Sequence, residues 1–435
     1  MKVLFGLTLL GLAFLFSTPP AGEAPTGFDN KSNGMVDDAT HAADLKVFDG
    51  VETVEDGLGP LYNAQACREC HQNPVSGGGS QIAELRAGHR ARNGQFENPA
   101  IPIAHGKEII TGRTLINNRA ICPNAAFPAE DIQERLPPSE RIHTFRASLN
   151  LLGDGFVEAV PDSTFVRLAK DQCTKSHGKI CGQVQYVPII EAPGETGVGR
   201  FGWKDQHASL LSFSGDAYLN EMGITSPLFP DEVTNICNTA PEPNDKPDAD
   251  GLTDVDRFAR FVRATKAPAR DEQQAKTPAA QRGEKLFRQI GCETCHVSEL
   301  TTAPAGTEIN GGKYAIPAAL GDKKLYPYGD FLMHDVGTGD GIVVATVEHY
   351  SRRMMRSAVQ WRNFSTARLE SNANRIRTAP LWGVRMRPLL MHDGESVTLR
   401  GAILRHRGEA SQARRGFLQL SRADQDAIVE FLKSL

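Results

Sequence analysis

Two pentapeptides of one pattern decide how this chain is read: Cys67-Arg68-Glu69-Cys70-His71 and Cys292-Glu293-Thr294-Cys295-His296. In each, two thiols three positions apart can form thioether bonds to the two vinyl groups of one haem, and the following histidine can bind the iron. A Cys-x-x-Cys redox pair and half of a zinc site use the same cysteine spacing. Neither explains why histidine follows the second cysteine in both copies. The sequence therefore predicts two covalently bound c-type haems, with His71 and His296 as iron ligands.

The N-terminus has the pattern of a signal peptide, which we predict to span residues 1–24. A basic start is followed by an apolar run over 3–16, and then by prolines and small residues that offer a cleavage site. That run is too short to span a bilayer comfortably, and no later stretch is long and apolar enough to do so. Because haem is attached covalently outside the cytoplasm, we expect the mature chain in the periplasm, without a membrane span.

Four of the eight cysteines lie outside the pentapeptides, namely Cys122, Cys173, Cys181 and Cys237. In an oxidising compartment, an even number of remaining cysteines usually forms disulfides. We favour Cys173–Cys181, across what reads as the tip of a hairpin, together with Cys122–Cys237. Sequence alone leaves three pairings open.

The 435 residues suffice for about two or three domains, and the formal net charge of −4 gives no reason to expect nucleic-acid binding. The second pentapeptide follows a helical pattern at 283–287, and its half ends with a capping-box pattern at 421–424 and helical spacing over 428–435. In the N-terminal half, residues 59–63 precede the first pentapeptide, where the C-terminal half has its helix. The N-terminal half ends with helical spacing over 255–262.

We therefore predict a mainly α fold of two cytochrome c-like domains with long loops, each binding one haem. The N-terminal domain would span 25–270 and carry an insertion at about 100–200 with little regular β structure. The C-terminal domain would span 271–435. The stretch 267–281, rich in proline, alanine, glutamine and charge, reads as the linker.

Five phrases carry a resemblance to a known group: Asn-Ala-Gln-Ala-Cys at 63–67, Gly-Arg-Phe-Gly-Trp-Lys at 199–204, Leu-Met-His-Asp-Val-Gly at 332–337, Arg-Thr-Ala-Pro-Leu-Trp-Gly at 377–383 and Met-His-Asp-Gly at 391–394. With them the chain resembles the bacterial di-haem cytochrome c peroxidase superfamily, which includes the maturation enzyme MauG. Within it, the chain is most similar to the di-haem oxidoreductase branch (putative peroxidases, also "thiol oxidoreductases"). The phrases are specific to the superfamily and not to a substrate.

The resemblance implies a second ligand for the C-terminal haem. In the family it lies fourteen residues after the histidine of a His-Asp-Gly segment, and is methionine in typical peroxidases and tyrosine in MauG. Here that offset leads from His392 to His406. Histidine can ligate haem iron, and the resulting bis-histidine site should be low-spin and of lower potential than a His/Met site. The alternative is a solvated histidine in a basic stretch.

For the N-terminal haem, the resemblance implies that Trp203 lies between the haems and that Glu221 is the acid/base at the distal face. Glu221 stands two residues closer to the tryptophan than in the family pattern, and the family's pocket glutamine corresponds to Phe213 here. His207 could supply the missing polar group, and His89 could instead cap this haem. Core packing for Trp203 and an exposed helix carboxylate for Glu221 are the ordinary alternatives.

Several further residues are candidates for supporting roles. We expect His334 and His392 to be structural or to contact haem propionates. Arg377, Arg385 and Arg387 could pair with propionates, because guanidinium groups suit carboxylates. A calcium ion between the haems is a further candidate cofactor, although an Arg-Pro pair stands at 387–388 where the family has Thr and Pro.

The leading interpretation is a peroxidase-type oxidoreductase. Its N-terminal haem would keep an open face for hydrogen peroxide, and its C-terminal haem would transfer electrons from a small periplasmic cytochrome or cupredoxin. A second interpretation is a MauG-like oxidase that draws electrons from the side chains of a protein partner, which the histidine at 406 slightly favours. A third is a non-enzymatic electron carrier with both haems six-coordinate. The natural substrate and oligomeric state stay open.

Overall fold

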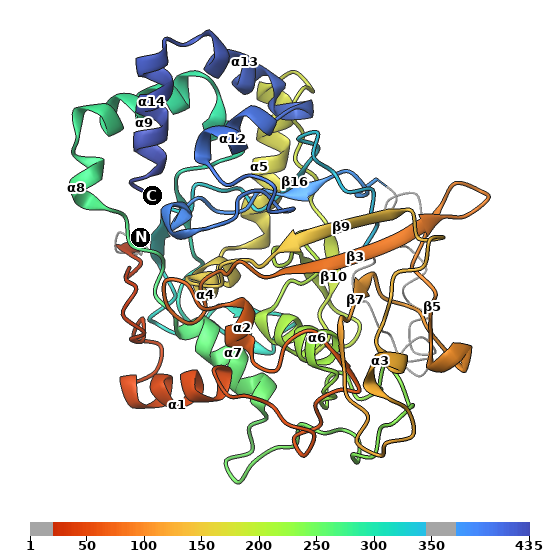
Figure 1. Cartoon of the computed structure of the whole chain (residues 1–435). Coiled ribbons are helices and arrows are strands. Elements are labelled where there is room, and N and C mark those ends of the chain that lie inside the picture. The colour runs from red at the N-terminus through yellow and green to blue at the C-terminus, as the bar shows by residue number, and fades with distance from the viewer. Residues whose placement is uncertain (1–20, 345–370) are drawn as a thin grey trace, which may run out of the picture.

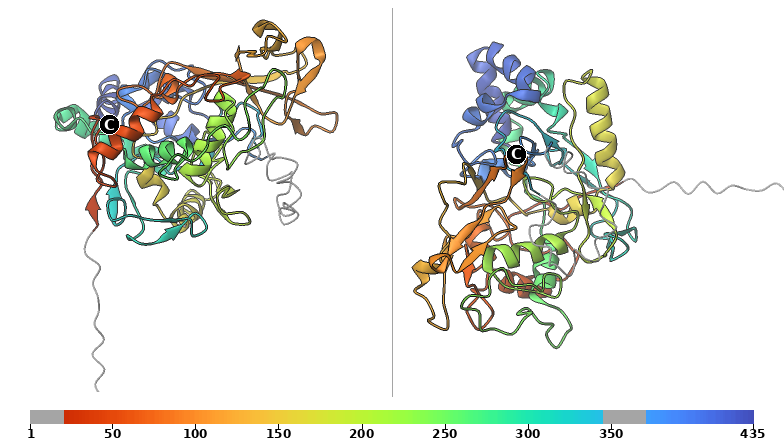
Figure 2. Two further views of the ribbon diagram at one scale, coloured as in Figure 1. Left: turned by 90° about the horizontal axis from the view of Figure 1, so that it is seen from below. Right: turned by 90° about the vertical axis from the view of Figure 1, so that its right-hand side faces the viewer.

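The computed structural model describes residues 21–344 and 371–435, so nearly all of the predicted signal peptide lies outside the described residues. The C-terminal helices group together at one end of the molecule, and the long strands β3 and β9 run across its middle (Figure 1). Seen from the side, these strands and helix α5 lie on opposite sides of the molecule (Figure 2). No helix within the described residues has the length and apolar character needed to cross a bilayer.

The elements are as follows. The helices are α1 (Asp38–Phe48), α2 (Cys67–Cys70), α3 (Ala129–Ile132), α4 (Asp154–Glu158), α5 (Asp162–Lys175), α6 (Leu210–Met222), α7 (Asp254–Ala264), α8 (Glu272–Ala275), α9 (Pro278–Gln289), α12 (Leu399–Arg405), α13 (Ser411–Gln419) and α14 (Arg422–Leu432). The strands are β1 (Gly22–Glu23), β2 (Leu61–Tyr62), β3 (Ala83–Arg90), β4 (Phe96–Glu97), β5 (Ile101–Ile103), β6 (Glu108–Ile110), β7 (Leu115–Ile116), β8 (Arg119–Ala120), β9 (Ile142–Ala147), β10 (Tyr186–Pro188), β11 (Thr196–Val198), β12 (Leu300–Thr301), β13 (Glu308–Ile309), β14 (Tyr314–Ala315), β15 (Lys323–Leu325), β16 (Met333–His334) and β17 (Ile376–Arg377).

The prediction of a mainly α fold is wrong, because about 30% of the residues are helical and 15% are in strands. The largest sheet joins β3 to β4, β7 and β9, with β3 and β9 paired antiparallel from Ala83↔Ala147 to Gly88↔Ile142. Hairpins β5–β6 and β10–β11 add strands within 100–200. Alanine, glutamate, leucine and arginine in β3 favour helix when considered alone. Pairing with a distant strand overrides that preference, and sequence periodicity does not report such pairing.

The helices predicted near the ends of the two halves are confirmed. Ser421 caps α14 by accepting a hydrogen bond from the backbone N–H of Asp424 (3.2 Å). Helices α9 and α14 approach closely at Gly283, where a Cβ atom would stand 1.9 Å from the carbonyl oxygen of Ala427. In the first half, α7 matches the pattern at 255–262. Residues 61–62, however, form β2 and pair with β8, and the helix that precedes the first pentapeptide is α1.

One apolar core crosses the predicted domain boundary, and a second cluster lies within the C-terminal part. The largest apolar cluster joins Phe156 and Phe261 to Phe331 and Trp382, on both sides of the predicted boundary at 270. Strand β1 pairs in parallel with β15, so residues 22–23 are tied to the C-terminal half. The two pentapeptide regions are therefore held in a fixed relation by apolar packing and by backbone pairing.

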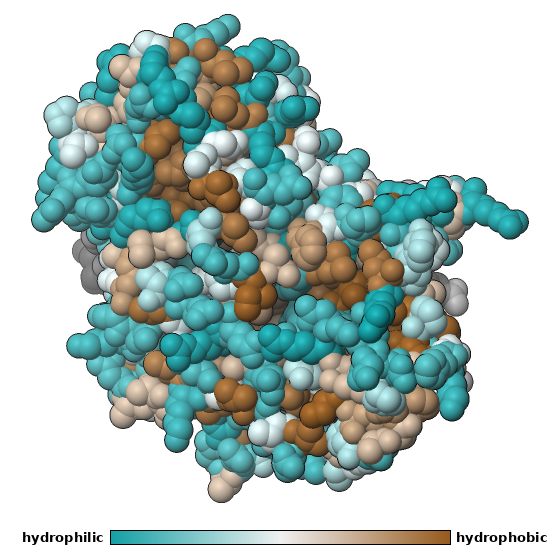
Figure 3. All heavy atoms as spheres, in the orientation of Figure 1, coloured by the Kyte–Doolittle hydropathy of each residue, from teal (hydrophilic) through white to brown (hydrophobic). Residues whose placement is uncertain are grey.

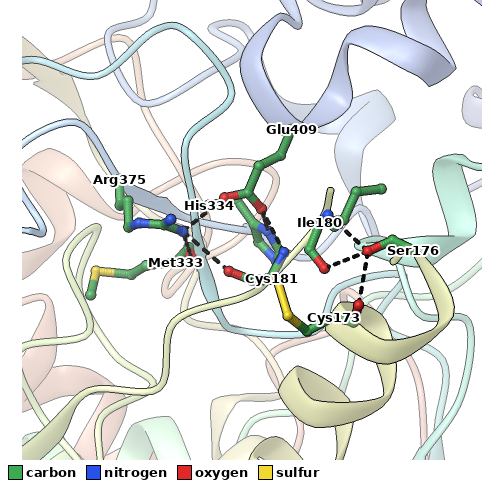
Figure 4. Close-up of a disulfide and its surroundings, with 8 residues drawn as sticks. All are labelled: Cys173, Ser176, Ile180, Cys181, Met333, His334, Arg375 and Glu409. Carbon is green, nitrogen blue, oxygen red and sulfur yellow. Dashed lines mark hydrogen bonds and ion pairs between the residues drawn. A yellow bond between two sulfur atoms is a disulfide. The ribbon is translucent and has the colours of Figure 1, made fainter. Parts of the chain in front are cut away.

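The cysteines outside the pentapeptides form the two predicted disulfides, Cys122–Cys237 and Cys173–Cys181. The expected hairpin tip is absent from the segment that joins Cys173 to Cys181. Cys173 lies in the last turns of α5, and the chain then turns back to Cys181. The Ser176 hydroxyl holds this turn by accepting a hydrogen bond from the Ile180 N–H (2.8 Å), as Figure 4 shows.

Candidate functional site

The second pentapeptide lines a cavity of about 900 Å³ together with His406 of the segment that follows α12. Apolar surface gathers over the C-terminal helices around this region (Figure 3). The Nδ1 atom of His296 lies 3.0 Å from the carbonyl oxygen of Tyr328, and that of His406 lies 2.8 Å from the carbonyl oxygen of Ala402. A carbonyl at Nδ1 fixes the tautomer in which Nε2 carries the lone pair used for metal binding. Both rings are thus prepared as ligands.

The spacing of these two imidazoles matches a metal between them. Their ring centroids lie 6.4 Å apart, with the ring planes at 59°. Metal–imidazole bonds are about 2 Å long, and two of them on opposite sides of one metal ion put the centroids about 6 Å apart. Burial lowers the pKa of His296 to about 4, which keeps this ring in the neutral form that binds metals. The residues of this cavity therefore fit an iron with two axial histidines.

A buried polar network lies behind Cys295 in the same wall. His334 contacts Asp330 (Nε2–Oδ2 3.0 Å) and Glu409 (Nδ1–Oε2 2.7 Å), and its Nδ1 lies 3.8 Å from the Cys295 sulfur. Burial lowers the pKa of His334, but the negative charge of Asp330 outweighs this effect, and the pKa of His334 lies well above its ordinary value. Glu409 also accepts a hydrogen bond from the Cys181 N–H (3.2 Å), so the disulfide loop is joined to the site (Figure 4).

Two of the three arginines expected at propionates line this cavity, Arg377 and Arg387. Within the described residues, one buried Nη2 atom of Arg387 has no hydrogen-bond partner, which a carboxylate of a bound haem would satisfy. Arg385 lies elsewhere, because it donates to the carbonyl oxygens of Leu435 and Ala269 (both 2.6 Å). The calcium ion stays a prediction.

The first pentapeptide lines a second cavity, which is smaller, at about 140 Å³. The Nδ1 atom of His71 lies 2.8 Å from the carbonyl oxygen of Leu149 and 3.2 Å from that of Gly78, the same arrangement as at His296. The four pentapeptide thiols form no disulfide. They are therefore free for thioether bonds, whereas the other four cysteines are paired.

Glu221, on α6, lines this smaller cavity and takes part in a cluster that the sequence did not reveal. Glu84 lines the same cavity, and the Oε2 atom of Glu221 accepts a hydrogen bond from Asn63 (3.2 Å). Arg86 donates to Glu84 through Nε (3.0 Å) and Nη2 (2.7 Å). Burial and the neighbouring Glu84 raise the pKa of Glu221 well above its ordinary value. Glu84 and Arg86 stand two apart on β3, a spacing that would have placed them on one face had the strand been recognised.

Trp203 lines both cavities. Its indole N–H donates to the carbonyl oxygen of Ala147 (2.8 Å), and its ring meets His392 edge-on, with centroids 6.1 Å apart. The ring also packs with Leu149 and Ile376. Trp203 is therefore a core residue that also lines both cavities. Both ring nitrogens of His392 are buried without a hydrogen-bond partner in the described part of the chain.

Two histidines considered for the N-terminal site are engaged elsewhere. His89, on β3, contacts Glu140 (2.7 Å) and Glu97 (3.3 Å). His207 contacts Asp216 (3.2 Å). Neither is among the described residues that line the smaller cavity, whereas Phe213 is.

One family of known proteins matches most of the chain. The model of the family "Di-haem oxidoreductase, putative peroxidase" matches residues 122–345 and 361–435. The chain therefore belongs to this family of di-haem oxidoreductases. The match contains the second pentapeptide, Trp203, Glu221 and His406, and begins after the first pentapeptide. No curated protein matches the chain.

Solved structures give weaker likenesses. Hydrazine synthase of Kuenenia stuttgartiensis is 14% identical, with 99% of this chain and 100% of that chain covered and a TM-score of 0.39. The di-haem peroxidase BthA of Burkholderia thailandensis is 14% identical, with 96% and 94% covered and a TM-score of 0.38. A MauG-like protein associated with microbial copper homeostasis is 18% identical, with 42% and 52% covered and a TM-score of 0.24. These scores carry no argument about this chain.

Proposed function

We propose that the chain is an exported di-haem c-type oxidoreductase that reacts with hydrogen peroxide at the N-terminal site and transfers electrons through the C-terminal site. The observation that carries the proposal is the difference between two cavities that share Trp203. Among the described residues, the larger has an imidazole on each side, and the smaller has one imidazole, His71, and a half-buried carboxyl group, Glu221. Export rests on the N-terminal signal pattern.

When bound, the two haems supply irons that bind peroxide and hold oxidising equivalents. The residues of the chain supply the rest. His71 would hold the N-terminal haem through its imidazole, in the cavity where peroxide would bind. Glu221, whose raised pKa keeps its carboxyl group protonated, would serve as the acid/base group that gives a proton to the leaving oxygen of peroxide. Trp203 offers an aromatic ring that lines both sites, and His296 and His406 would both hold the C-terminal haem.

The electron donor would be a small periplasmic cytochrome or cupredoxin that docks near the larger cavity. A second candidate function is a MauG-like oxidase that takes electrons from the side chains of a protein partner. The facing imidazoles of His296 and His406 favour it, because a bis-histidine haem has a lower potential than a His/Met haem and suits electron uptake from a cytochrome less well.

The test begins with the mass of the purified chain. Two covalent haems are expected, and one haem or none would overturn the proposal. The double variant Cys67→Ala/Cys70→Ala should lose one haem. Its matched control, Cys173→Ala/Cys181→Ala, changes two cysteines outside the pentapeptides and should keep both.

An electron paramagnetic resonance spectrum of the resting ferric protein then separates the candidate functions. One high-spin and one low-spin signal support an open N-terminal site. Two low-spin signals, with no spectral change on adding peroxide, would favour the electron carrier instead. If the open site is present, turnover with a reduced cytochrome rather than with a protein substrate supports the peroxidase.

A further inference from the structure

Strand β3 brings two charged side chains into the N-terminal cavity from a part of the sequence far before Glu221. Glu84 and Arg86 both line this cavity and stand two residues apart, as side chains on one face of a strand do. Arg86 is held by Glu84 and by the hydroxyl of Thr114 (3.3 Å). Its Nη2 atom reaches to 3.9 Å from Glu221. The cavity wall therefore carries Glu84 and Glu221 with the guanidinium group of Arg86 beside them, and Arg146 and Asp216 line it as well.

Two carboxyl groups that line one small cavity beside the same guanidinium group repel each other when both are ionised, so we expect them to hold one proton between them. The position of that proton follows from the contacts. Arg86 makes two hydrogen bonds to Glu84 and lies farther from Glu221, which favours the ionised form at Glu84. Burial raises the pKa of Glu84, but the positive charge of Arg86 outweighs this effect, and the pKa of Glu84 lies below its ordinary value. The neutral member is Glu221, whose second oxygen is held by Asn63.

We propose that Glu84 is the acid/base partner of Glu221, and that Arg86 positions it. This inference rests on the proposed reaction with peroxide. Glu221 gives its proton to the leaving oxygen of peroxide as the O–O bond breaks, and that oxygen departs as water. Glu84 accepts the proton of the oxygen that stays at the metal. The two electrons come from the haem sites of the proposed function, and the carboxyl pair holds one proton before and after the step.

The pair also accounts for the residue at 213. The family's second polar group of this pocket corresponds to Phe213, which cannot exchange a proton. Of the proposed substitutes, His207 is engaged by Asp216. Glu84 and Arg86 supply a charged group and a hydrogen-bond donor in the same cavity, from a strand instead of a helix.

The test compares Glu84→Gln with Glu97→Gln, a matched change at an exposed glutamate of the neighbouring strand β4. Glu84→Gln should keep both haems and slow the reaction with peroxide by about 10²–10⁴-fold, the usual contribution of a proton-transfer group. Glu97→Gln should react like the wild type. Glu84→Asp retains a carboxylate and should restore part of the rate, which a purely structural role would not explain. Wild-type rates in Glu84→Gln would overturn the inference.

A readout independent of turnover is the infrared band of a protonated carboxyl group, followed as a function of pH in the resting protein. Other carboxyl groups, such as Asp205, also have raised pKa values, so the band of Glu221 is isolated as the difference between the wild-type and Glu221→Gln spectra. In the wild type this band should persist above neutral pH. Glu84→Gln should shift its loss to lower pH, because the charge that holds the proton on Glu221 is gone. A band unchanged in Glu84→Gln would refute the carboxyl pair. A wild type with this band but inert to peroxide would instead refute the proposed function.

Discussion

The two disulfides close loops of very different length, and this predicts different losses of stability when each is removed. Their sequence separations are 115 residues for Cys122–Cys237 and 8 for Cys173–Cys181. A cross-link stabilises mainly by restricting the unfolded chain, in proportion to the logarithm of the loop length. The loop-entropy relation gives about 4.8 kcal/mol for the long loop and about 2.5 kcal/mol for the short one. The difference between the two variants should therefore be about 2 kcal/mol.

The assay is urea unfolding of the haem-loaded protein, with each disulfide removed as a double cysteine-to-alanine variant. The short loop has other anchors, since the Cys181 N–H donates to Glu409 and the Cys181 carbonyl oxygen accepts from Arg375 (3.2 Å) (Figure 4). Because of these contacts, removal of the short-loop disulfide should lower the free energy of unfolding by no more than the loop-entropy value. An equal or larger loss for the short loop would refute the reasoning, and would mean that the disulfide stabilises the wall of the larger cavity directly.

Three further predictions concern single side chains. His406→Ala should convert the low-spin signal of the C-terminal haem to high-spin and leave the other haem unchanged, and a surviving low-spin signal would assign the ligand elsewhere. Trp203→Phe should leave peroxide binding nearly unchanged and slow oxidation of the second haem in stopped-flow spectra, and equal rates would remove the bridging role. Burial raises the pKa of Glu52 from 4.5 to about 7, so the folded protein keeps a proton that the unfolded chain loses and stability falls as pH rises through that window. Glu52→Gln should abolish this fall, about 3 kcal/mol between pH 4 and 8 in urea titrations, and an unchanged pH dependence would contradict the assignment.

The parts of the site that the sequence predicted are those encoded by short spacing. The pentapeptides state their chemistry in five residues, and the structure leaves their thiols unpaired while joining the other four cysteines as predicted. The prediction of His406 and Trp203 needed information beyond the local sequence, because each residue was located by its offset in a family that the chain resembles. The structure puts His406 opposite His296 and Trp203 in the walls of both cavities.

The sheet could not be predicted in the same way. Strand β3 exists because it pairs with β9, and the residues between them form other strands and loops. Locally, its alanines and charged residues read as a helix or a solvated stretch. The error in fold class and the failure to find Glu84 therefore have a single cause. A group that faces a cavity from a strand defined by long-range pairing has no signature in its immediate neighbours.

The orientation of the predicted histidine ligands is also set by segments that are distant in sequence. The groups that set it are backbone carbonyl oxygens, which are the same for every residue type. His71 is held by the backbone carbonyl oxygen of Leu149, just after β9, and His296 by that of Tyr328, in the loop between β15 and β16. Any residue at either position offers the same carbonyl oxygen, so the sequence there is free to vary without loss of the hydrogen bond. What must be kept is the path of the backbone. The pentapeptide therefore determines which atom binds the metal, and the packing of remote segments determines the direction in which that atom points.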